Sequence, residues 1–238
     1  MTVDSSQVDR FSRELELCSV DERILWAYKS FGNRLGLMTA CGYSGVVLMH
    51  LLSRLEVNIE TYFIDTGFHF PETLELVRTV RSRLGIDLKV VTSPITRAAL
   101  TKALGERPWE TDPDLCCQYM KIEPLMRVIR DKDAWLSAVR RDQSPTRAEI
   151  DVVEVDERDV IKIYPLADWT SEQTWSHLRD HDLPYSPLHD NGYMSVGCLH
   201  CTRPVRAGEH ERAGRWASMS KAECGIHAFR RKRPKTSR

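Results

Sequence analysis

Hydrophobic positions along the chain follow two spacings, one typical of buried strands and one typical of helices. Short apolar runs predict strands at 34–39, 62–64, 87–92, 134–139 and 161–164. Apolar residues three and four apart predict helices at 21–31, 46–55, 71–84, 120–129 and 170–181. We expect loops at 108–113 and after Pro184, where proline and glycine recur. Because strands and helices alternate, the expected fold class is α/β, with a mostly parallel twisted sheet and helices on both faces.

Two loops follow predicted strands, at the sheet edge where parallel sheets bind their ligands. The first, ACGYSG at 40–45, lies between a strand and a helix, so backbone N–H groups and the helix dipole can hold a phosphate there. The GxxxxGK[ST] pattern of a Walker A loop is absent. The second loop is DTG at 65–67. The candidate ligand-binding residues in these loops are Gly42, Tyr43, Ser44, Asp65, Thr66 and Gly67. Taken alone, each loop is also compatible with an ordinary polar turn.

The composition is that of a globular protein without a strong field of one sign. The chain has 238 residues, of which 42% are hydrophobic and 29% are charged, and 34 Lys and Arg balance 34 Asp and Glu. This balance argues against nucleic acid as a partner, and no apolar run approaches the roughly 20 residues of a membrane helix. We expect a cytoplasmic protein with one α/β domain over 1–220 and a mobile segment over 221–238 that ends in a basic tail. The sequence leaves the oligomeric state open, including a homo-oligomer.

Four of the seven cysteines form two close pairs, and this pattern indicates a metal centre. They are Cys116, Cys117, Cys198 and Cys201. Four thiolates suit a tetrahedral zinc ion or an iron–sulfur cluster, and adjacent cysteines fit the separate iron atoms of a cubane better than one ion. The alternative is that they are small buried apolar residues. Lys121 follows one helical turn after the first pair, where its ammonium could approach an anionic cluster, although a solvated surface lysine is the commoner case.

Arginines gather in two further stretches. The residues concerned are Arg140, Arg141 and Arg147, which surround Gln143 and Ser144, and Arg203, Arg206, Arg212 and Arg215. Guanidinium groups bind phosphate and sulfate in bidentate fashion, so two such clusters suggest a doubly anionic ligand. Surface ion pairs with Asp142, Glu209 and Glu211 are the alternative.

Cys224 is a single thiol close to the end of the chain, with Lys221 and His227 nearby and Gly225 next to it. Cations lower the pKa of a thiol and enrich the nucleophilic thiolate. A cysteine on a flexible segment could reach a buried substrate and then turn outward to a reductant. An incidental exposed thiol is the alternative.

Several motifs occur together, in the order and spacing of one known family. They are CC at 116–117 followed by Lys121, RRDQSPTR at 140–147, SPLHDNGYMSVGC at 186–198, CLHCTRP at 198–204, ERAGRW at 211–216 and ECGIH at 223–227. Together they resemble the adenylylsulfate/phosphoadenylylsulfate reductase family, specifically its cluster-bearing branch. The resemblance covers nearly the whole chain.

The resemblance implies an adenine nucleotide alpha hydrolase-like fold and a [4Fe–4S] cluster held by the four paired cysteines. It also implies that Cys224 attacks the sulfur of adenylylsulfate, that AMP leaves, and that an S-sulfocysteine remains. Thioredoxin or a similar dithiol would then release sulfite. The residues implied to face the phosphosulfate are Lys121, Arg140 or Arg141, Arg212, Arg215 and His227, with Gln143 beside them. The two loops at 40–45 and 65–67 would hold the nucleotide.

The chain departs from the family pattern at the nucleotide loop, which reads Tyr43-Ser44-Gly45 where many cluster-bearing members have an acidic pair. Tyr119-Met120 also precedes Lys121 where an arginine often stands. The choice between adenylylsulfate and its 3′-phosphorylated form (PAPS) therefore stays open, and we favour adenylylsulfate because all four ligand cysteines are present. One alternative is an adenylating enzyme of the ATP-pyrophosphatase type, although its SGGxDS-like loop is absent. The other is a zinc-stapled nucleic-acid-binding module, which would leave Cys224 without a role.

Overall fold

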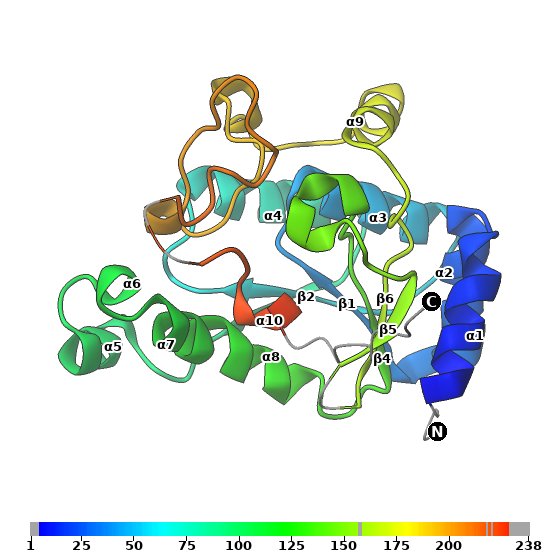
Figure 1. Ribbon diagram of the computed structural model, residues 1–238, viewed down its shortest axis with the longest axis horizontal. Coiled ribbons are helices and arrows are strands. Elements are labelled where there is room, and N and C mark those ends of the chain that lie inside the picture. The colour runs from blue at the N-terminus through cyan, green and yellow to red at the C-terminus, as the bar shows by residue number, and fades with distance from the viewer. Residues whose placement is uncertain (1–4, 157–158, 218, 220, 229–238) are drawn as a thin grey trace, which may run out of the picture.

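A six-stranded sheet forms the centre of the computed structural model, which describes residues 5–156, 159–217, 219 and 221–228 (Figure 1). The strands are β1 (Leu35–Thr39), β2 (Glu60–Asp65), β3 (Leu88–Thr92), β4 (Ala134–Leu136), β5 (Val153–Val155) and β6 (Ile161–Ile163). Their order is β3-β2-β1-β4-β6-β5, and all neighbours are parallel except the antiparallel pair β5 and β6. The predicted α/β class with a mostly parallel sheet is confirmed.

Helices cover both faces of this sheet. They are α1 (Ser5–Glu16), α2 (Val20–Phe31), α3 (Tyr43–Arg54), α4 (Pro71–Leu84), α5 (Arg97–Leu104), α6 (Pro108–Thr111), α7 (Pro113–Cys117), α8 (Glu123–Val128), α9 (Ser171–Asp180) and α10 (Gly225–Ala228). In Figure 1, α3 and α4 lie above the sheet, and α5, α7 and α8 lie below it. Helix α9 packs on α3, and α1 packs against the edge strand β5.

Some local predictions were wrong. The expected loop at 108–113 contains the short helix α6, and the helix expected at 120–129 is the end of a longer helical run. That run begins at Pro113 and includes a π-helical turn at Gln118–Ile122. The sequence pattern also missed α1, α5 and β5. Strand β5 has 3 residues, as do β4 and β6, but only one of its residues is buried, so it lacks the continuous apolar run that revealed the other two.

The strand order places a crevice between β1 and β4. These strands are neighbours, but the chain leads from β1 outward to β2 and β3, whereas β6 and β5 lie beyond β4. At such a point the connections diverge, and ligands bind outside the carboxyl ends of the two strands. The fold therefore provides one preferred place for a binding site.

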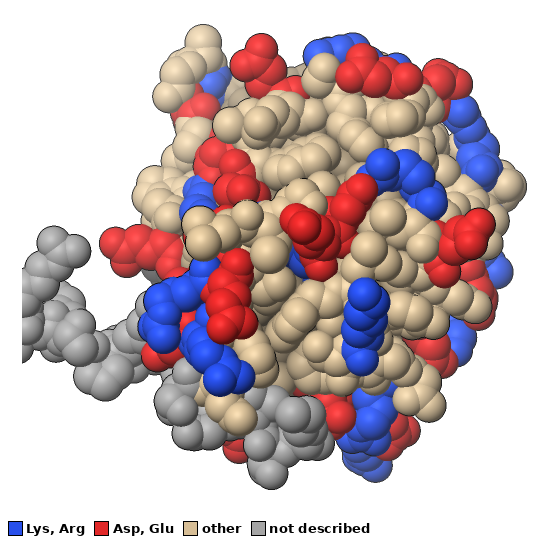
Figure 2. All heavy atoms as spheres, turned by 90° about the vertical axis from the view of Figure 1, so that its right-hand side faces the viewer, with Lys and Arg blue, Asp and Glu red and all other residues tan. Residues whose placement is uncertain are grey.

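Two further observations concern the outside of the molecule. On the face that carries α1 and α2, acidic and basic side chains are interspersed (Figure 2), in keeping with the balanced charge of the chain. Within the described residues, none of the helices combines the length and the apolar character that crossing a membrane requires.

Candidate active site

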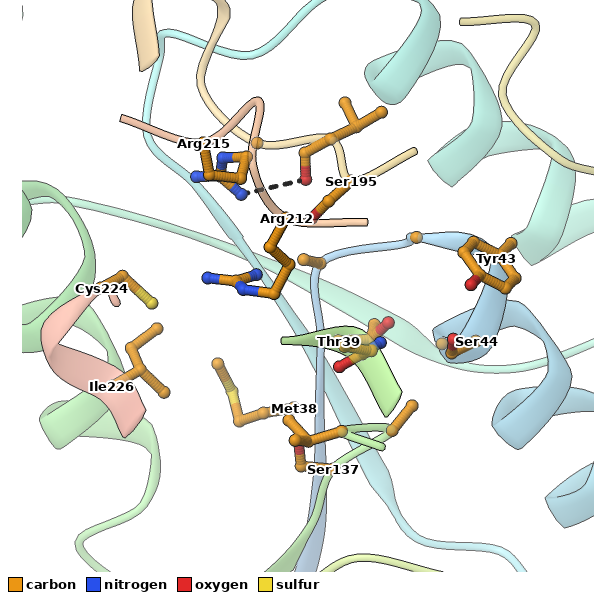
Figure 3. Close-up of a pocket in the computed structure, with 18 of the residues that line it drawn as sticks. Met38, Thr39, Tyr43, Ser44, Ser137, Ser195, Arg212, Arg215, Cys224 and Ile226 are labelled. Carbon is orange, nitrogen blue, oxygen red and sulfur yellow. Dashed lines mark hydrogen bonds between the residues drawn. The ribbon is translucent and has the colours of Figure 1, made fainter. Parts of the chain in front are cut away.

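A cavity lies at the carboxyl ends of β1 and β4, where the strand order predicts it (Figure 3). Met38 and Thr39 line it from β1, and Ser137 lines it just after β4. Most of the remaining lining comes from the first turn of α3 and from segments 194–197, 211–216 and 224–226. Other segments contribute a few residues each. The cavity therefore brings together parts of the chain that are far apart in sequence.

Helix α3 begins at Tyr43, so part of the predicted 40–45 loop is helical. Gly42 is the N-cap residue, and the N–H groups of the first helical turn have no partner within the helix. The helix approaches β1 very closely here, because a Cβ at Gly45 would lie 2.5 Å from Thr39 Oγ1. Gly42, Tyr43 and Ser44 all line the cavity. The start of α3 is thus available to bind an anionic or polar ligand.

Arg140 lies beneath the start of α3 and is completely buried. Its guanidinium donates to Ser44 Oγ, to Tyr43 OH at 2.8 Å and to Glu211 Oε2 at 2.8 Å. Burial raises the pKa of the Glu211 carboxyl, although Arg140 and Tyr43 both oppose this. Arg140 does not itself line the cavity but orders two residues that do, Tyr43 and Ser44. It therefore supports the first turn of α3 from behind.

Arg141 lies elsewhere, and the structure contradicts its grouping with this cavity. Its guanidinium donates to both carboxylate oxygens of Glu16, at 2.6 and 2.8 Å, and to the carbonyl of Ile150 at 2.9 Å. These partners belong to a surface groove beside α1. The chain turns at this point, because Arg140 is extended and Arg141 begins a 3₁₀ turn (Arg141–Gln143), so the two adjacent arginines reach different partners.

Unlike Arg141, the cationic residues Lys121, Arg212 and Arg215 line the cavity together with Cys224. The Cys224 thiol and the Arg212 guanidinium point toward one another across it (Figure 3). Arg215 donates to the carbonyls of Val196 and Cys201, each at 3.4 Å. His227 belongs to α10, but its side chain lies outside the described part of the structure.

Gln143 and Arg147 also line the cavity and are hydrogen-bonded to each other at 2.5 Å. Arg147 forms an ion pair with Glu223, next to Cys224. Arg203, by contrast, pairs with Glu209, as the surface-ion-pair alternative predicted. The second arginine cluster is therefore divided, because Arg212 and Arg215 line the cavity and Arg203 does not.

The four paired cysteines line a second, smaller cavity. Cys116 and Cys117 end α7, and Cys198 and Cys201 flank a 3₁₀ turn; all four are buried and none forms a disulfide. Burial raises the pKa of Cys116 to about 12 and that of Cys201 to about 11. A bound metal centre removes this cost, because it takes thiols as thiolates. Buried, unpaired thiols in one cavity therefore fit a thiolate-bound metal centre.

Lys121 lines both cavities. Burial lowers the pKa of its ammonium, but the neighbouring Cys198 and Cys117 thiolates raise the pKa above its usual value. Lys121 lies on the π-helical turn, which changes the angular offset between it and Cys117 relative to a regular helix. The structure therefore excludes the alternative of a solvated surface lysine.

The 65–67 loop lies beside the cysteines rather than in the larger cavity. Thr66 lines the cysteine cavity, and its Oγ1 lies 3.3 Å from Cys198 Sγ. Asp65 accepts the N–H of Gly67 at 2.8 Å, which closes the turn. The described lining of the larger cavity includes none of the three, so the structure does not bring them to the predicted nucleotide site.

Sequence reasoning missed several polar groups of the larger cavity. Glu211 was considered only as a surface ion-pair partner, although it lies in the ERAGRW motif with Arg212. Buried polar atoms of cavity-lining residues that have no hydrogen-bond partner among the described residues include His69 Nδ1, Arg212 Nε and Trp216 Nε1. Buried polar groups are normally paired, so a polar ligand is expected to satisfy them.

The chain is similar in sequence and in fold to several known proteins. A curated relative named adenosine 5′-phosphosulfate reductase, from Halalkalibacterium halodurans, is 44% identical over 92% of this chain and 96% of its own. One from Gloeobacter violaceus, named phosphoadenosine 5′-phosphosulfate reductase, is 40% identical over 96% of both chains. The crystal structure of phosphoadenylyl-sulfate reductase from Candida auris has a TM-score of 0.77 and 30% identity, covering 85% of this chain and 99% of that one.

The family model described as the phosphoadenosine phosphosulfate reductase domain matches residues 34–204. This range includes both cysteine pairs and the strands that form the cavity. The chain belongs to the phosphoadenosine phosphosulfate reductase domain family.

Proposed function

We propose that the chain reduces adenylylsulfate to sulfite and AMP, with thioredoxin or a related dithiol as electron donor. The observation that carries this proposal is the position of Cys224 in one cavity with Lys121, Arg212 and Arg215. A thiol beside several cations is suited to attack an anionic activated sulfate, because the cations stabilise both the thiolate and the substrate. Relatives named for adenosine 5′-phosphosulfate support the same substrate class.

The reaction requires two steps at Cys224. Its thiolate attacks the sulfur of adenylylsulfate, so that an S–S bond forms, the bridging S–O bond breaks, and AMP leaves with the electron pair. Cys224 then carries an S-sulfonate. One thiolate of the dithiol attacks the Cys224 sulfur and releases sulfite, and the second thiolate resolves the mixed disulfide. The dithiol is oxidised to a disulfide, two protons are released, and Cys224 returns to its thiolate form.

The cations have separate tasks in the first step. We assign Arg212 and Arg215 to the oxygens of the phosphosulfate, because guanidinium groups bind such oxyanions in bidentate fashion. Lys121 approaches from the cysteine side of the cavity. As the S–O bond breaks, negative charge grows on the phosphate of AMP, and positive groups already in place lower the barrier.

The start of α3 is the proposed nucleotide site. Gly42, Tyr43 and Ser44 present unpaired backbone donors and two hydroxyls there. Arg140 fixes both hydroxyl-bearing side chains from behind. The ring of Tyr43 also stacks on Trp175, with ring centroids 4.7 Å apart, which further fixes the Tyr43 side chain.

We assign Cys116, Cys117, Cys198 and Cys201 as the residues that would hold a [4Fe–4S] cluster. When bound, the cluster would supply a fixed negative charge that orients Lys121. The four thiols line one cavity, and two of them are adjacent in sequence, which suits the separate iron atoms of a cubane better than a single zinc ion.

Mass spectrometry of the intact protein tests the function directly. After anaerobic mixing with adenylylsulfate and no reductant, we expect a mass increase of one SO₃ group on Cys224. Cys224→Ser should abolish the adduct and sulfite production, whereas Cys18→Ser, a thiol outside both cavities, should keep both. Sulfite production by Cys224→Ser would refute the proposal. A parallel reaction with PAPS tests the substrate preference, for which we place adenylylsulfate first because four ligand cysteines are present.

A further inference from the structure

The segment 221–226, here called the C-terminal strap, carries Cys224 and is attached at three points. Lys221 Nζ bonds to Asp114 and, at 3.3 Å, to the carbonyl of Pro113, both in the first turn of the cysteine-bearing helix α7. Glu223 binds arginines at the cavity wall. The carbonyl of Ile226 accepts from Lys162 Nζ at 3.1 Å. The strap therefore lies across the cavity between separate parts of the fold.

Glu223 makes the most extensive of these contacts. Its Oε1 accepts from Arg147 Nε at 2.8 Å, and its Oε2 accepts from Arg147 Nη2 at 2.8 Å and from Arg212 Nη2 at 2.9 Å. Thr146 Oγ1 donates to Oε1 at 3.1 Å. The Arg147 and Arg212 side chains are each only 8% exposed and that of Glu223 is 15% exposed. Charge-assisted bonds in such a buried setting are much stronger than surface ion pairs.

The carboxylate also separates two cations that would otherwise repel. Burial and the neighbouring Arg147 both lower the pKa of Arg212, and Glu223 opposes them. Without that carboxylate, two buried guanidinium groups would face each other beneath the strap. Arg212 Nε has no partner among the described residues, so the same guanidinium can hold Glu223 on one edge and an oxyanion on another.

We propose that Glu223 is a positioning residue that docks the C-terminal strap on Arg147 and Arg212 and thereby holds Cys224 in the cavity. Cys224 directly follows Glu223 in the chain. Docking of the Glu223 carboxylate therefore restricts where the Cys224 thiol can lie. Arg212 then connects strap docking with substrate binding, since it touches both. The docking itself stands on the contacts above, and only its catalytic consequence rests on the proposed function.

The test compares Glu223→Gln with the matched variant Glu209→Gln in full-length, cluster-loaded protein under anaerobic conditions. Glu209 also accepts two bonds from one arginine, Arg203, both at 2.9 Å, but outside the cavity. We measure the rate of trypsin cleavage after Lys221 and the maximal rate of Cys224 alkylation over a series of alkaline pH values. Glu223→Gln should raise both rates about tenfold, the scale of one lost charge-assisted pair, and Glu209→Gln should leave them unchanged.

Activity measurements separate positioning from general damage. In Glu223→Gln we expect kcat to fall about tenfold, because Cys224 is held less firmly in the cavity. KM should not rise, because Arg212 no longer pairs with a carboxylate that competes with the substrate. If Glu223→Gln fails to fold, the shorter carboxylate of Glu223→Asp should give intermediate cleavage rates.

Cleavage and alkylation rates equal to wild type in both Glu223 variants would overturn the strap inference. A different result, sulfite production by Cys224→Ser, would contradict the proposed function. The trypsin measurement involves no substrate and no thiol chemistry. The two failures can therefore be told apart.

Discussion

At the scale of single residues, Lys121 connects the two cavities. It lines the cavity of Cys224 on one side and that of the four paired cysteines on the other. A partly buried ammonium is costly to charge, and the thiolates around it offset that cost. Its charge is thus held in place before substrate arrives, which is the arrangement that lowers a barrier most effectively.

Lys121→Ala is expected to slow S-sulfocysteine formation about a hundredfold, the scale of removing one charged group that stabilises a transition state. The visible absorbance of the cluster should remain. Single-turnover mass spectrometry measures the rate, and Lys121→Arg, which keeps the charge, should lose less. Unchanged single-turnover kinetics in Lys121→Ala would contradict this role.

At the scale of elements, the contact of α3 with α9 connects the end of the cavity formed by α3 to a surface cluster of histidines. Near the cavity, Tyr43 OH and Ser171 Oγ lie 3.0 Å apart. Farther along the helices, His50 Nδ1 lies 3.0 Å from His177 Nε2, and the His177 and His181 rings lie 4.4 Å apart. Charging these rings together would push the two helices apart.

This cluster predicts a loss of stability at acidic pH. Burial and the neighbouring His181 and His50 lower the pKa of His177 to about 4 from its unfolded value of 6.5. The unfolded chain therefore binds more protons between these values, so the stabilisation is complete above pH 6.5 and is lost as the pH falls toward 4. Because the rings are half exposed, we expect the loss to be about 1 kcal/mol. Urea unfolding across this pH range measures it, and an equal pH slope in His177→Gln would disprove the assignment.

The loop 203–216, which carries Arg212 and Arg215, depends on a close backbone contact. Arg203 N–H donates to the Gly214 carbonyl at 2.9 Å, and a Cβ at Gly214 would overlap the carbonyl oxygen of Arg203. Gly214→Ala is expected to destabilise the protein by about 1–3 kcal/mol, measured by urea unfolding. In the control Gly36→Ala, the nearest atom would be 3.6 Å away, so little change is expected. Equal stability of the two variants would show that the loop adapts freely.

At the scale of the whole molecule, the cysteine cavity joins regions that are distant in sequence. Helix α7 supplies Cys116 and Cys117, the segment after α9 supplies Cys198 and Cys201, and Thr66 after β2 bonds to Cys198. A metal centre held by all four thiols would cross-link these regions. Such a centre contributes to folding as well as to chemistry.

Cys198→Ser is expected to remove the metal centre. Anaerobically purified wild type should contain iron and sulfide, whereas Cys198→Ser should lose most of both and unfold at a lower temperature. Metal analysis and thermal unfolding followed by circular dichroism make the two measurements. Cys18→Ser should match wild type in both. Zinc without iron in wild type would refute the cluster assignment.

The sequence alone determined the fold class and the candidate chemistry. Buried strands and amphipathic helices leave periodic patterns, so β1, α3, β2 and α4 could be predicted from local spacing. Thiols and guanidinium groups have few chemical uses, so close cysteine pairs and arginine clusters could be recognised before any geometry was known. The family resemblance rested on the same motifs, and the comparisons confirm it.

Only the tertiary structure decided which of these residues meet. Arg140 pairs with Glu211 at the cavity, whereas Arg141 pairs with Glu16 beside α1. Thr66 contacts Cys198, and Glu223 pairs with Arg147 and Arg212. The physical reason is that spacing along the chain records which side of an element is buried, whereas a site depends on which distant elements then pack together. The direction of one side chain, and the partner that satisfies its charge, is settled only when the fold is complete.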